Sequence, residues 1–381
     1  MLTTTNQELH ATLTPGGVEA RRKANELISR YEKILRDGVL QWTTHHKLHR
    51  LLGKGGQGVV YLTDLRGADS FTVPVALKIF SPDRYEDARS YAEAMARIAH
   101  VAARVAQIQH DNLLDIHNFM DRDRIRMMVM EWVDGYDLQR LLVPSMLERI
   151  RTRVSVRRWE YINRVIVTGG TSQPRIKPGI AVAIVRDCLS ALAALHREDV
   201  VHGDIKPANI MLKRTGRAKI VDIGAAFERC DPPPHRTCTP NYAAPEALEG
   251  GEITPLSDLA SLGYVLIEML SGQNPFAGKK TFRELLEAKR RLPQILLEIL
   301  PAEVTVNELL MKFCSRLVAP DPMMRFPSAE AADLHKDGAA GFHRQLVIGD
   351  LASEYGNEIR LWLEELKELD EQMSPEHLSE L

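Results

Sequence analysis

The sequence has few cysteines and no excess of charge of either sign. Its four cysteines are scattered, and none forms a Cys-x-x-Cys pair: Cys188, Cys230, Cys238 and Cys314. This scarcity excludes a disulfide framework and argues against a zinc or dithiol redox site, so we expect a reducing compartment. Because the 49 basic and 51 acidic residues nearly cancel, no global field attracts nucleic acid or anionic lipid, and we expect neither as a partner.

Long hydrophobic runs are also missing. No stretch reaches the roughly 18 consecutive apolar residues of a membrane span, and the N-terminal segment has no basic region followed by an apolar one. We therefore expect a cytoplasmic protein. The 44% hydrophobic and 26% charged residues are ordinary globular values, and 381 residues are enough for two domains or one bilobal unit with extensions.

The hydrophobic pattern changes along the chain. Residues 18–40 have the spacing of an amphipathic helix, with apolar positions at Ala24, Leu27, Ile28, Tyr31, Ile34 and Leu35. We expect this helix to pack on the main body rather than to await a partner. Glycine-interrupted strand-like runs follow in 42–78, a helical pattern in 83–109, a buried strand near 124–133, and mostly helical periodicity after Gly135.

Two segments carry unbalanced charge. Residues 144–178, the basic insert, resemble an inserted helix plus a hairpin, and their basic side chains outnumber the acidic ones: Arg149, Arg151, Arg153, Arg157, Arg158, Arg164, Arg175 and Lys177. We expect the insert either to bind an acidic or phosphate-bearing partner or to be a solvated elaboration. Residues 342–381 predict an acidic amphipathic helix that packs on the main domain or on a second chain and neutralises the insert in cis or in trans; its apolar positions are Ile359, Leu361, Leu363 and Leu366.

The first chemical motif is glycine-rich and lies between two strand-like runs, at Gly53-Lys54-Gly55-Gly56-Gln57-Gly58. Glycines let backbone amides approach phosphate closely. A strand follows where a dinucleotide-binding fold needs a helix, and Val75-Ala76-Leu77-Lys78 lies in the next strand. This order is typical of a hairpin lid over nucleotide phosphates. Taken alone, the motif would equally describe a plain hairpin with a surface lysine.

Acidic and amide side chains follow in the second half of the chain. His202-Gly203-Asp204-Ile205-Lys206-Pro207-Ala208-Asn209 precedes Asp222-Ile223-Gly224 by a short interval. In phosphoryl transfer one carboxylate orients the attacking hydroxyl and accepts its proton, while a second carboxylate and an amide oxygen hold Mg²⁺ against the phosphates. Ala244-Pro245-Glu246, an apolar helix that begins near Asp258, and Asp321-Pro322-Met323-Met324-Arg325 complete the ordered set.

In this order the motifs resemble the protein kinase family over residues 46–335. The resemblance implies an α+β bilobal fold, with a β-rich N-lobe in 46–133, an α-rich C-lobe in 134–341, and helical extensions in 1–45 and 342–381. It also implies ATP bound between the lobes with Mg²⁺, or Mn²⁺ as the alternative metal, and a protein substrate.

The resemblance assigns roles residue by residue. Asp204 would be the catalytic base, and Asn209 and Asp222 would be the metal ligands. Lys206 would neutralise the transferring phosphoryl group, and Lys78 would grip the α- and β-phosphates. The other nucleotide contacts would come from the glycine-rich loop (Gly53, Lys54, Gly55, Gly58), the apolar walls of the adenine site (Val60, Ala76, Met211), the gatekeeper Met130, the hinge (Glu131, Val133) and the ribose-contacting Asp137.

Lys206 and Thr239-Pro240 resemble the serine/threonine branch of the family. In that branch the threonine hydroxyl bridges the catalytic aspartate and the lysine, so Thr239 would support catalysis. The resemblance also implies an ion pair between Glu246 and Arg325, and we expect both sets of contacts to be buried networks.

Two positions bear on how activity is controlled. Glu93 lies fifteen residues after Lys78, and we expect it to form the ion pair that holds Lys78 on the phosphates. Counting back from His110 gives a longer interval than the family's, which a lengthened helix with the same inward face would absorb. Gly203 stands where most kinases have an arginine that reads a phosphate on the activation loop. We therefore expect a bacterial-type kinase whose activity does not depend on loop phosphorylation.

Two other functions share part of this pattern. His-Gly-Asp is also the loop style of small-molecule kinases that resemble aminoglycoside and choline kinases, but Lys206, Thr239-Pro240 and Ala244-Pro245-Glu246 favour a protein substrate. A pseudokinase scaffold would bind partners through the basic insert or the terminal helices. The presence of the key polar residues argues against this scaffold and for an enzyme.

Overall fold

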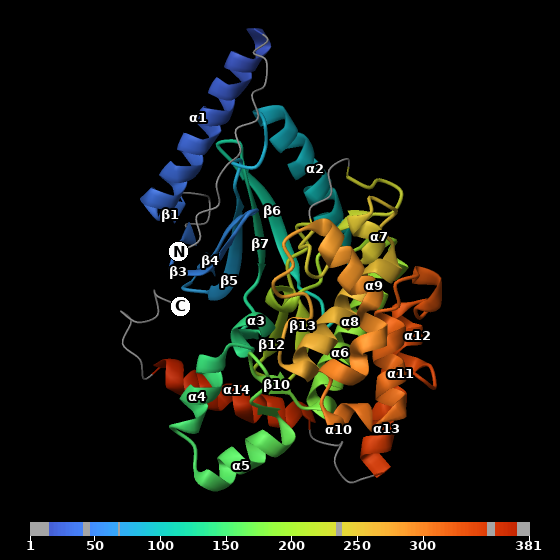
Figure 1. Cartoon of the computed structure of the whole chain (residues 1–381). Helices are drawn as coiled ribbons and strands as arrows, with labels where there is room; N and C mark the ends of the chain where they lie inside the picture. The colour runs from blue at the N-terminus through green and yellow to red at the C-terminus, as the bar shows by residue number, and fades with distance from the viewer. Residues whose placement is uncertain (1–14, 41–45, 68, 234–237, 349–354, 372–381) are drawn as a thin grey trace. The chain divides into compact units, whose positions relative to one another are not determined.

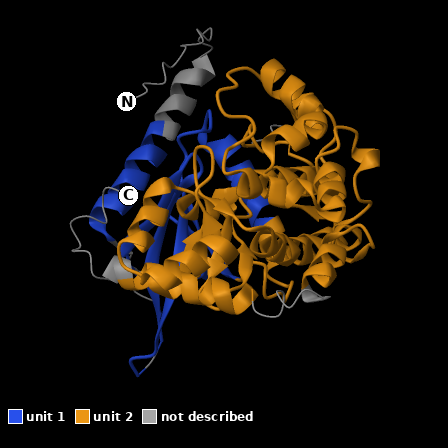
Figure 2. Ribbon diagram, turned by 60° about the horizontal axis from the view of Figure 1, so that its bottom comes forward, with its two compact units in different colours: residues 1–100, 116–132 blue, residues 101–115, 133–381 orange. Residues whose placement is uncertain are grey.

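The computed structural model describes residues 15–40, 46–67, 69–233, 238–348 and 355–371. Two compact units make up the chain: unit 1 is residues 1–100 and 116–132, and unit 2 is residues 101–115 and 133–381 (Figure 2). The amphipathic N-terminal helix belongs to unit 1, and the long second helix crosses from one unit into the other.

Unit 1 is built on a five-stranded antiparallel sheet of order β3-β4-β5-β7-β6. Its elements are α1 (Pro15–Asp37), β1 (Val39–Leu40), β2 (His46–Lys47), β3 (Arg50–Gly55), β4 (Gly58–Arg66), β5 (Thr72–Phe80), α2 (Ala88–Val105, shared with unit 2), β6 (Ile116–Arg122) and β7 (Ile125–Glu131) (Figure 1). Helix α1 contacts β7 and buries Leu27, Tyr31 and Ile34, so it packs in cis as expected.

Strand β5 has strand neighbours on both sides and is the centre of this sheet. Residues from Val75 to Phe80 are all buried, including Lys78 at 3% exposure. A strand covered on both faces reads as a continuous apolar run rather than as an alternation, which explains the Val-Ala-Leu-Lys-Ile-Phe sequence. The sheet therefore carries one buried lysine on its central strand.

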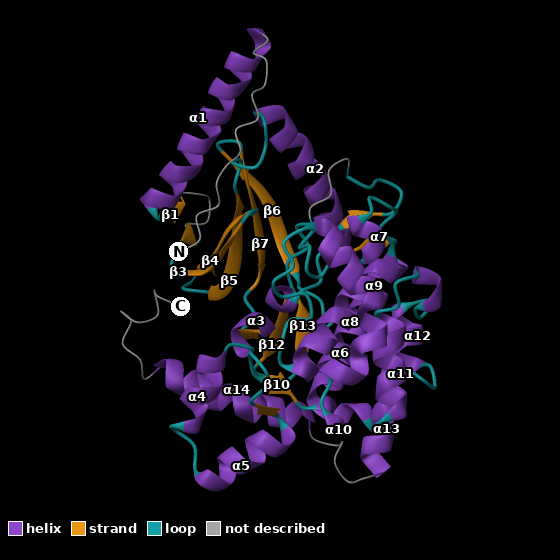
Figure 3. Cartoon of the chain, in the orientation of Figure 1, coloured by secondary structure: helices purple, strands orange, loops and turns teal. Residues whose placement is uncertain are grey.

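Unit 2 is mostly helical (Figure 3). Its helices are α3 (Leu138–Leu141), α4 (Pro144–Arg151), α5 (Val156–Val165), α6 (Pro178–Arg197), η1 (Pro207–Asn209), α7 (Pro245–Leu248), α8 (Pro255–Ser271), α9 (Phe282–Ile299), α10 (Ala302–Thr305), α11 (Glu308–Leu317), η2 (Pro322–Met324), α12 (Ala329–Leu334), α13 (Ala339–Ile348) and α14 (Tyr355–Glu371). Its strands are β8 (Gly135–Asp137), β9 (Val167–Thr168), β10 (Arg175–Ile176), β11 (Val200–Val201), β12 (Ile210–Lys213), β13 (Ala218–Ile220) and β14 (Phe227–Glu228).

Helices α6 and α8 contact each other in the core of unit 2. Both are apolar around most of their circumference, as buried helices are. Helix α8 begins at a capping box formed by Thr254 and Ser257 and ends at Gly272 in the left-handed conformation. Among the described helices, α6 is long and apolar enough to cross a membrane, but 78% of its apolar window is buried inside the protein, as expected of a core helix.

The basic insert and the C-terminal helix pack together. The insert forms α4, α5 and the β9–β10 hairpin, and α14 contacts α4 and α6 of the same chain. Arg158 of the insert pairs with Glu365 at 2.6 Å and with Glu358 at 3.5 Å, which is neutralisation in cis. The buried apolar face of α14 differs from the expected one at one position, because Trp362 is buried and Leu361 is half-buried.

Candidate active site

A buried carboxylate holds the loop that carries Asp204. Asp258, near the start of α8, is 1% exposed. It accepts the backbone N–H groups of His202 and Gly203, each at 2.9 Å, and the Nε2–H of His196 at 2.9 Å. Burial alone would raise the pKa of Asp258, but the hydrogen bond and charge of His196 hold it below its usual value. The loop is thereby fixed to the core helix just before Asp204.

Gly203 has a conformation that explains its residue type. Its φ is +74°, in the left-handed region that glycine adopts without steric cost. A Cβ there would lie 3.1 Å from the Ala225 carbonyl oxygen. A glycine at position 203 therefore suits the backbone of this loop.

Asp204 lies at the centre of a polar cluster in unit 2. Its Oδ1 accepts the Thr239 hydroxyl at 2.7 Å, and its Oδ2 accepts Lys206 Nζ at 2.6 Å. Lys206 Nζ also donates to Thr239 Oγ1 at 3.0 Å, so the expected bridge is formed. The expectation that it would be buried is wrong, because the side chains of Lys206 and Asp204 are 26% and 15% exposed. Asn209 donates its amide to the Asp204 carbonyl oxygen at 2.8 Å and to Oδ2 at 3.2 Å. The carboxylate is thus held in one orientation by an ammonium, a hydroxyl and an amide.

Asn209 and Asp222 offer oxygen atoms suited to Mg²⁺. Both side-chain hydrogen bonds of Asn209 in the described structure use its nitrogen, which leaves the amide oxygen for a cation. Asp222 has φ +65° and accepts the Gly224 N–H at 2.9 Å. Mg²⁺ is typically bound by one or two carboxylates together with substrate phosphates and water. This donor set fits that pattern, and no cluster of three or more His, Cys, Asp or Glu occurs in the described residues.

Two expected nucleotide contacts of unit 2 lie on neighbouring strands. Met211 of β12 pairs with Asp137 of β8. The Asp137 carboxylate accepts the Arg140 N–H at 2.9 Å as the N-cap of α3, and burial raises its pKa. Val133 is 7% exposed. The acidic residue expected to contact ribose therefore also has a local structural role.

The expected nucleotide-binding side chains of unit 1 share one face of its sheet. Val60 lies opposite Lys78 across β4 and β5, and Ala76 lies opposite Met130 across β5 and β7. Because directly paired residues and residues two apart point to the same face, all four side chains lie on that face. Glu131 pairs with Val75 and falls on the other face, so any hinge contact from Glu131 would use its backbone.

The glycine-rich loop is the hairpin between β3 and β4. Gly55 pairs with Gly58, so Gly56 and Gln57 form a two-residue turn. A Cβ added at Gly53 or Gly55 would meet nothing within 4 Å. The fold itself does not require glycine at those two positions, which is the pattern expected where backbone approaches a ligand.

Glu93 does not occupy its expected position. It lies on the outer face of α2 with its side chain 53% exposed, and it pairs with Arg89 at 2.7 Å. The buried face of α2 carries Tyr91, Met95 and Ala102. Glu93 follows Tyr91 by two residues, or about 200° around the helix, so it points away from that face. In the described structure the expected Lys78–Glu93 ion pair is absent, and that prediction is wrong.

Residues 239–246 are held by side chains from α8, from α9 and from the segment after η2. Arg325, just after η2, is 2% exposed and makes two hydrogen bonds to Glu246 at 2.7 and 2.8 Å, which confirms the expected pair. Tyr242 donates to Glu268 of α8 at 2.6 Å. Lys289 of α9 is fully buried and donates to the Asn241 carbonyl oxygen at 2.7 Å.

Sequence reasoning named Asp258 only as part of a helix and did not consider Lys289. The sequence feature that could have identified Asp258 is an acidic residue near the start of an otherwise apolar helix. Lys289 lies 3.8 Å from the Phe276 ring centroid and 4.1 Å from that of Tyr264, and burial lowers its pKa to about 6. A lysine on an amphipathic helix gives no sign of such burial, so no sequence signal identified it.

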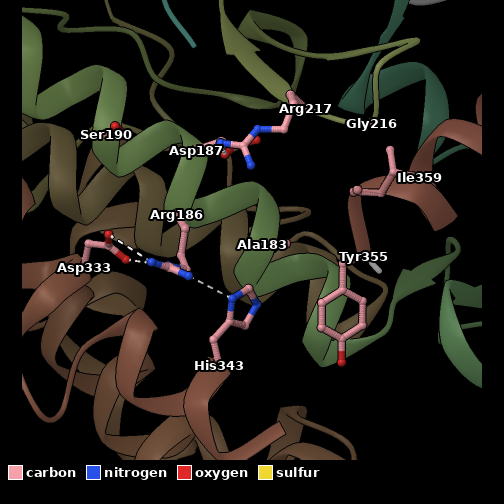
Figure 4. A pocket seen from close by; sticks show the side chains of 11 residues that line it. Ala183, Arg186, Asp187, Ser190, Gly216, Arg217, Asp333, His343, Tyr355 and Ile359 are labelled. Atoms are coloured by element: carbon pink, nitrogen blue, oxygen red, sulfur yellow. Dashed lines mark hydrogen bonds and ion pairs between the residues drawn. The ribbon is translucent and has the colours of Figure 1, made fainter. Parts of the chain in front are cut away.

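A separate cavity of about 360 Å³ lies among α6, α12, α13 and α14 (Figure 4). Its two arginines are paired within the wall, Arg186 with Asp333 at 2.7 Å and Arg217 with Asp187 at 2.8 Å. The wall is therefore internally neutralised. None of the expected site residues lines this cavity, so it does not belong to the Asp204 cluster.

Comparison with known proteins adds an independent finding. Residues 46–336 match the protein kinase domain. Over 309 residues the chain is 28% identical to the serine/threonine-protein kinase PrkC of Bacillus subtilis, covering 78% of this chain and 40% of PrkC. It is 32% identical over 235 residues to PknD of Mycobacterium tuberculosis (61% and 30%) and 30% identical over 249 residues to PkaB of Streptomyces coelicolor (62% and 50%), both serine/threonine-protein kinases. The chain spans half or less of the length of these relatives.

Proposed function

The chain belongs to the protein kinase family, and from this premise we propose that it transfers the γ-phosphoryl group of Mg-ATP to serine or threonine hydroxyls of proteins. The observation that carries the proposal is the cluster of Asp204, Lys206, Thr239 and Asn209, whose mutual hydrogen bonds measure 2.6 to 3.2 Å. Positioning and charge stabilisation are what phosphoryl transfer needs from a protein.

Each residue of the cluster has a defined task in this mechanism. The Asp204 carboxylate orients the substrate hydroxyl and accepts its proton, while Lys206 stabilises negative charge on the transferring group. Lys78 binds the α- and β-phosphates. Asn209 and Asp222 would hold Mg²⁺, which supplies charge neutralisation on the phosphates when bound.

A protein substrate is favoured over a small molecule by the segment after Thr239. The contacts of Asn241, Tyr242 and Glu246 with Lys289, Glu268 and Arg325 hold residues 239–246 as an ordered surface beside Asp204. Such a surface suits an extended polypeptide that presents its hydroxyl to the carboxylate. A small-molecule kinase would not require it, and this remains the alternative that the assay below addresses.

The test is transfer of labelled phosphate from Mg-ATP to generic proteins, to the chain itself, and to aminoglycosides and amino alcohols. Asp204→Asn should lower transfer at least about a thousandfold while retaining nucleotide binding. Asp222→Asn should weaken metal-dependent nucleotide binding. Asp123→Asn, at an acid whose side chain is 66% exposed, is the matched control and should behave as wild type. Full activity in Asp204→Asn would refute the mechanism, and label on small molecules alone would replace the proposed substrate class.

We also propose that the basic insert binds an acidic or phosphate-bearing partner through its exposed arginines. Arg158, Arg175 and Lys177 are neutralised within the chain by Glu365 and Glu303. Arg151 and Arg157, which flank the turn between α4 and α5, remain exposed. Changing both to glutamate should abolish salt-dependent binding of acidic or phosphorylated peptides. Unchanged binding would leave the insert as a solvated elaboration.

We propose a cytoplasmic location because the cysteines form no disulfide bonds in the described structure. All four are unpaired in the structure, and Cys230 is exposed, which suits a reducing compartment. Cell fractionation tests this proposal: recovery in the soluble cytoplasmic fraction would support it, and recovery with membranes would contradict it.

A further inference from the structure

Lys78 is contacted by the turn of the glycine-rich hairpin. Its Nζ donates to the side-chain oxygen of Gln57 at 2.8 Å. Lys78 is 3% exposed, and Gln57 is half-buried. A hydrogen bond from a buried ammonium to an amide oxygen is charge-assisted and fixes the direction of the amine.

The hairpin geometry creates this contact. Gly58 has φ +138°, and a Cβ there would lie 2.0 Å from the Ile79 carbonyl oxygen, so only glycine lets the turn lie this close to β5. The Gln57 carbonyl oxygen accepts the Ser81 N–H at 3.0 Å. The main chain of Gln57 is therefore held by Ser81, directly after β5, and its side-chain amide lies beside Lys78 of β5.

The helix that would supply an acidic partner does not do so. The buried face of α2 carries Tyr91 and Met95, each 1% exposed, while Glu93 lies on the opposite face. The Tyr91 hydroxyl donates to the Phe80 carbonyl oxygen at 3.2 Å and accepts the Arg126 N–H at 2.9 Å. These two bonds set the rotation of α2 about its axis and keep Glu93 turned outward.

We propose that Gln57 is a positioning residue that aims Lys78 at the nucleotide phosphates, in place of a glutamate from α2. The inference rests on the proposed kinase function. An ammonium has three N–H donors, and the bond to Gln57 uses one of them. Because the amide is neutral, it orients Lys78 without cancelling its positive charge. The orientation of Lys78 is then set within the β-sheet and requires no movement of α2.

The test compares five variants in steady-state phosphoryl transfer and in binding of a non-hydrolysable ATP analogue. Lys78→Met removes the ammonium and gives the reference for a full loss. Gln57→Leu removes the acceptor and should lower kcat/KM for Mg-ATP about tenfold, with KM for the protein substrate unchanged. Gln57→Glu keeps an acceptor at the same reach and should retain kcat at saturating nucleotide. Glu93→Ala should remain within about twofold of wild type. Gln107→Leu, at an exposed glutamine beyond the end of α2, is the matched control for the substitution itself.

The outcomes separate the inference from the function on which it rests. Wild-type activity in Gln57→Leu, or a loss in Glu93→Ala as large as that in Lys78→Met, would overturn the positioning role. A loss in Gln57→Leu that Gln57→Glu does not share would support it. If the wild type transfers no phosphate, the kinase proposal fails, but binding of the ATP analogue still tests the role of Gln57. Binding about tenfold weaker in Gln57→Leu than in wild type would support that role. Unchanged binding would overturn it.

Discussion

The loop around Asp204 and the sheet around Lys78 keep their charged groups in place by different means. Asp204 is surrounded by side chains from its own loop and from the Thr239 segment, and Asp258 ties that loop to a buried helix. Lys78 is placed by the central strand of a sheet and by an amide from a hairpin turn. In the first region tertiary contacts converge on the acid, while in the second the strand register does most of the positioning.

This difference teaches where substitutions should matter. In unit 2 the polar network is half-buried and its members share partners, so removing one leaves another unsatisfied. In unit 1 Glu93, the expected acidic partner of Lys78, lies on the exposed face of α2. We therefore expect substitutions in the Asp204 region to change activity or stability strongly, and substitutions on the exposed face of α2 to change them little.

The largest effect on stability is expected at Glu246. Its carboxylate pairs with Arg325, whose side chain is 0% exposed, so Glu246→Ala leaves a buried cation uncompensated. Breaking such a pair should cost about 3–5 kcal/mol, measured by urea unfolding. Glu249→Ala, which breaks a surface pair with Arg290, is the matched control and should cost about 0–1 kcal/mol. Equal losses of unfolding free energy in the two variants would contradict the expectation that the buried pair stabilises the protein more than the exposed pair.

Thr239 should give the next largest effect, on turnover rather than on stability. Thr239→Ala removes the hydroxyl that donates to Asp204 and accepts from Lys206. We expect kcat to fall about 10- to 100-fold, the value of a hydrogen bond to a charged group, with the midpoint of unfolding retained. Thr239→Ser restores the hydroxyl and should restore most of kcat. A serine variant as slow as the alanine variant would contradict the proposed bridge.

The same contrast separates what the sequence could predict from what it could not. The Asp204–Lys206–Thr239 contacts and the Glu246–Arg325 pair were expected because each motif is a short segment whose residue types fit one arrangement. The β-rich and helix-rich regions follow from periodicity. Glu93 was misplaced because an interval along the chain was used to infer its position, whereas helix rotation determines which face is buried.

The evidence for that rotation was present in the sequence. Tyr91, Met95, Ala102 and Val105 have helical spacing and are among the buried residues of α2, so their pattern alone puts Glu93 on the opposite face. The contacts of Gln57 and Lys289 had no such signal. They depend on how closely a hairpin lies on its sheet and how deeply a helix is buried.

Lys289 should make stability depend on pH. Burial lowers its pKa to about 6, against roughly 10.4 in an unfolded chain. Between these values the unfolded state binds the additional proton, so stability rises with pH, by up to about 1.4 kcal/mol per pH unit. The flanking rings favour the ammonium form and reduce this slope. Lys289→Met should abolish the slope between pH 7 and 9, while Lys312→Met, at an exposed lysine, should leave it unchanged.

The smallest effect is expected on the outer face of α2, and it bears most directly on the comparison. Arg89→Ala breaks a pair in which both side chains are more than half exposed. Screening by water leaves such pairs almost without net stabilisation, so thermal unfolding should shift by less than about 1 °C and transfer activity should be unchanged. A marked rise in activity would mean that releasing Glu93 from Arg89 lets α2 turn its carboxylate toward Lys78. That result would show that the position of Lys78 depends on a tertiary contact with α2, as the position of Asp204 depends on tertiary contacts. It would contradict the proposed difference between the two regions.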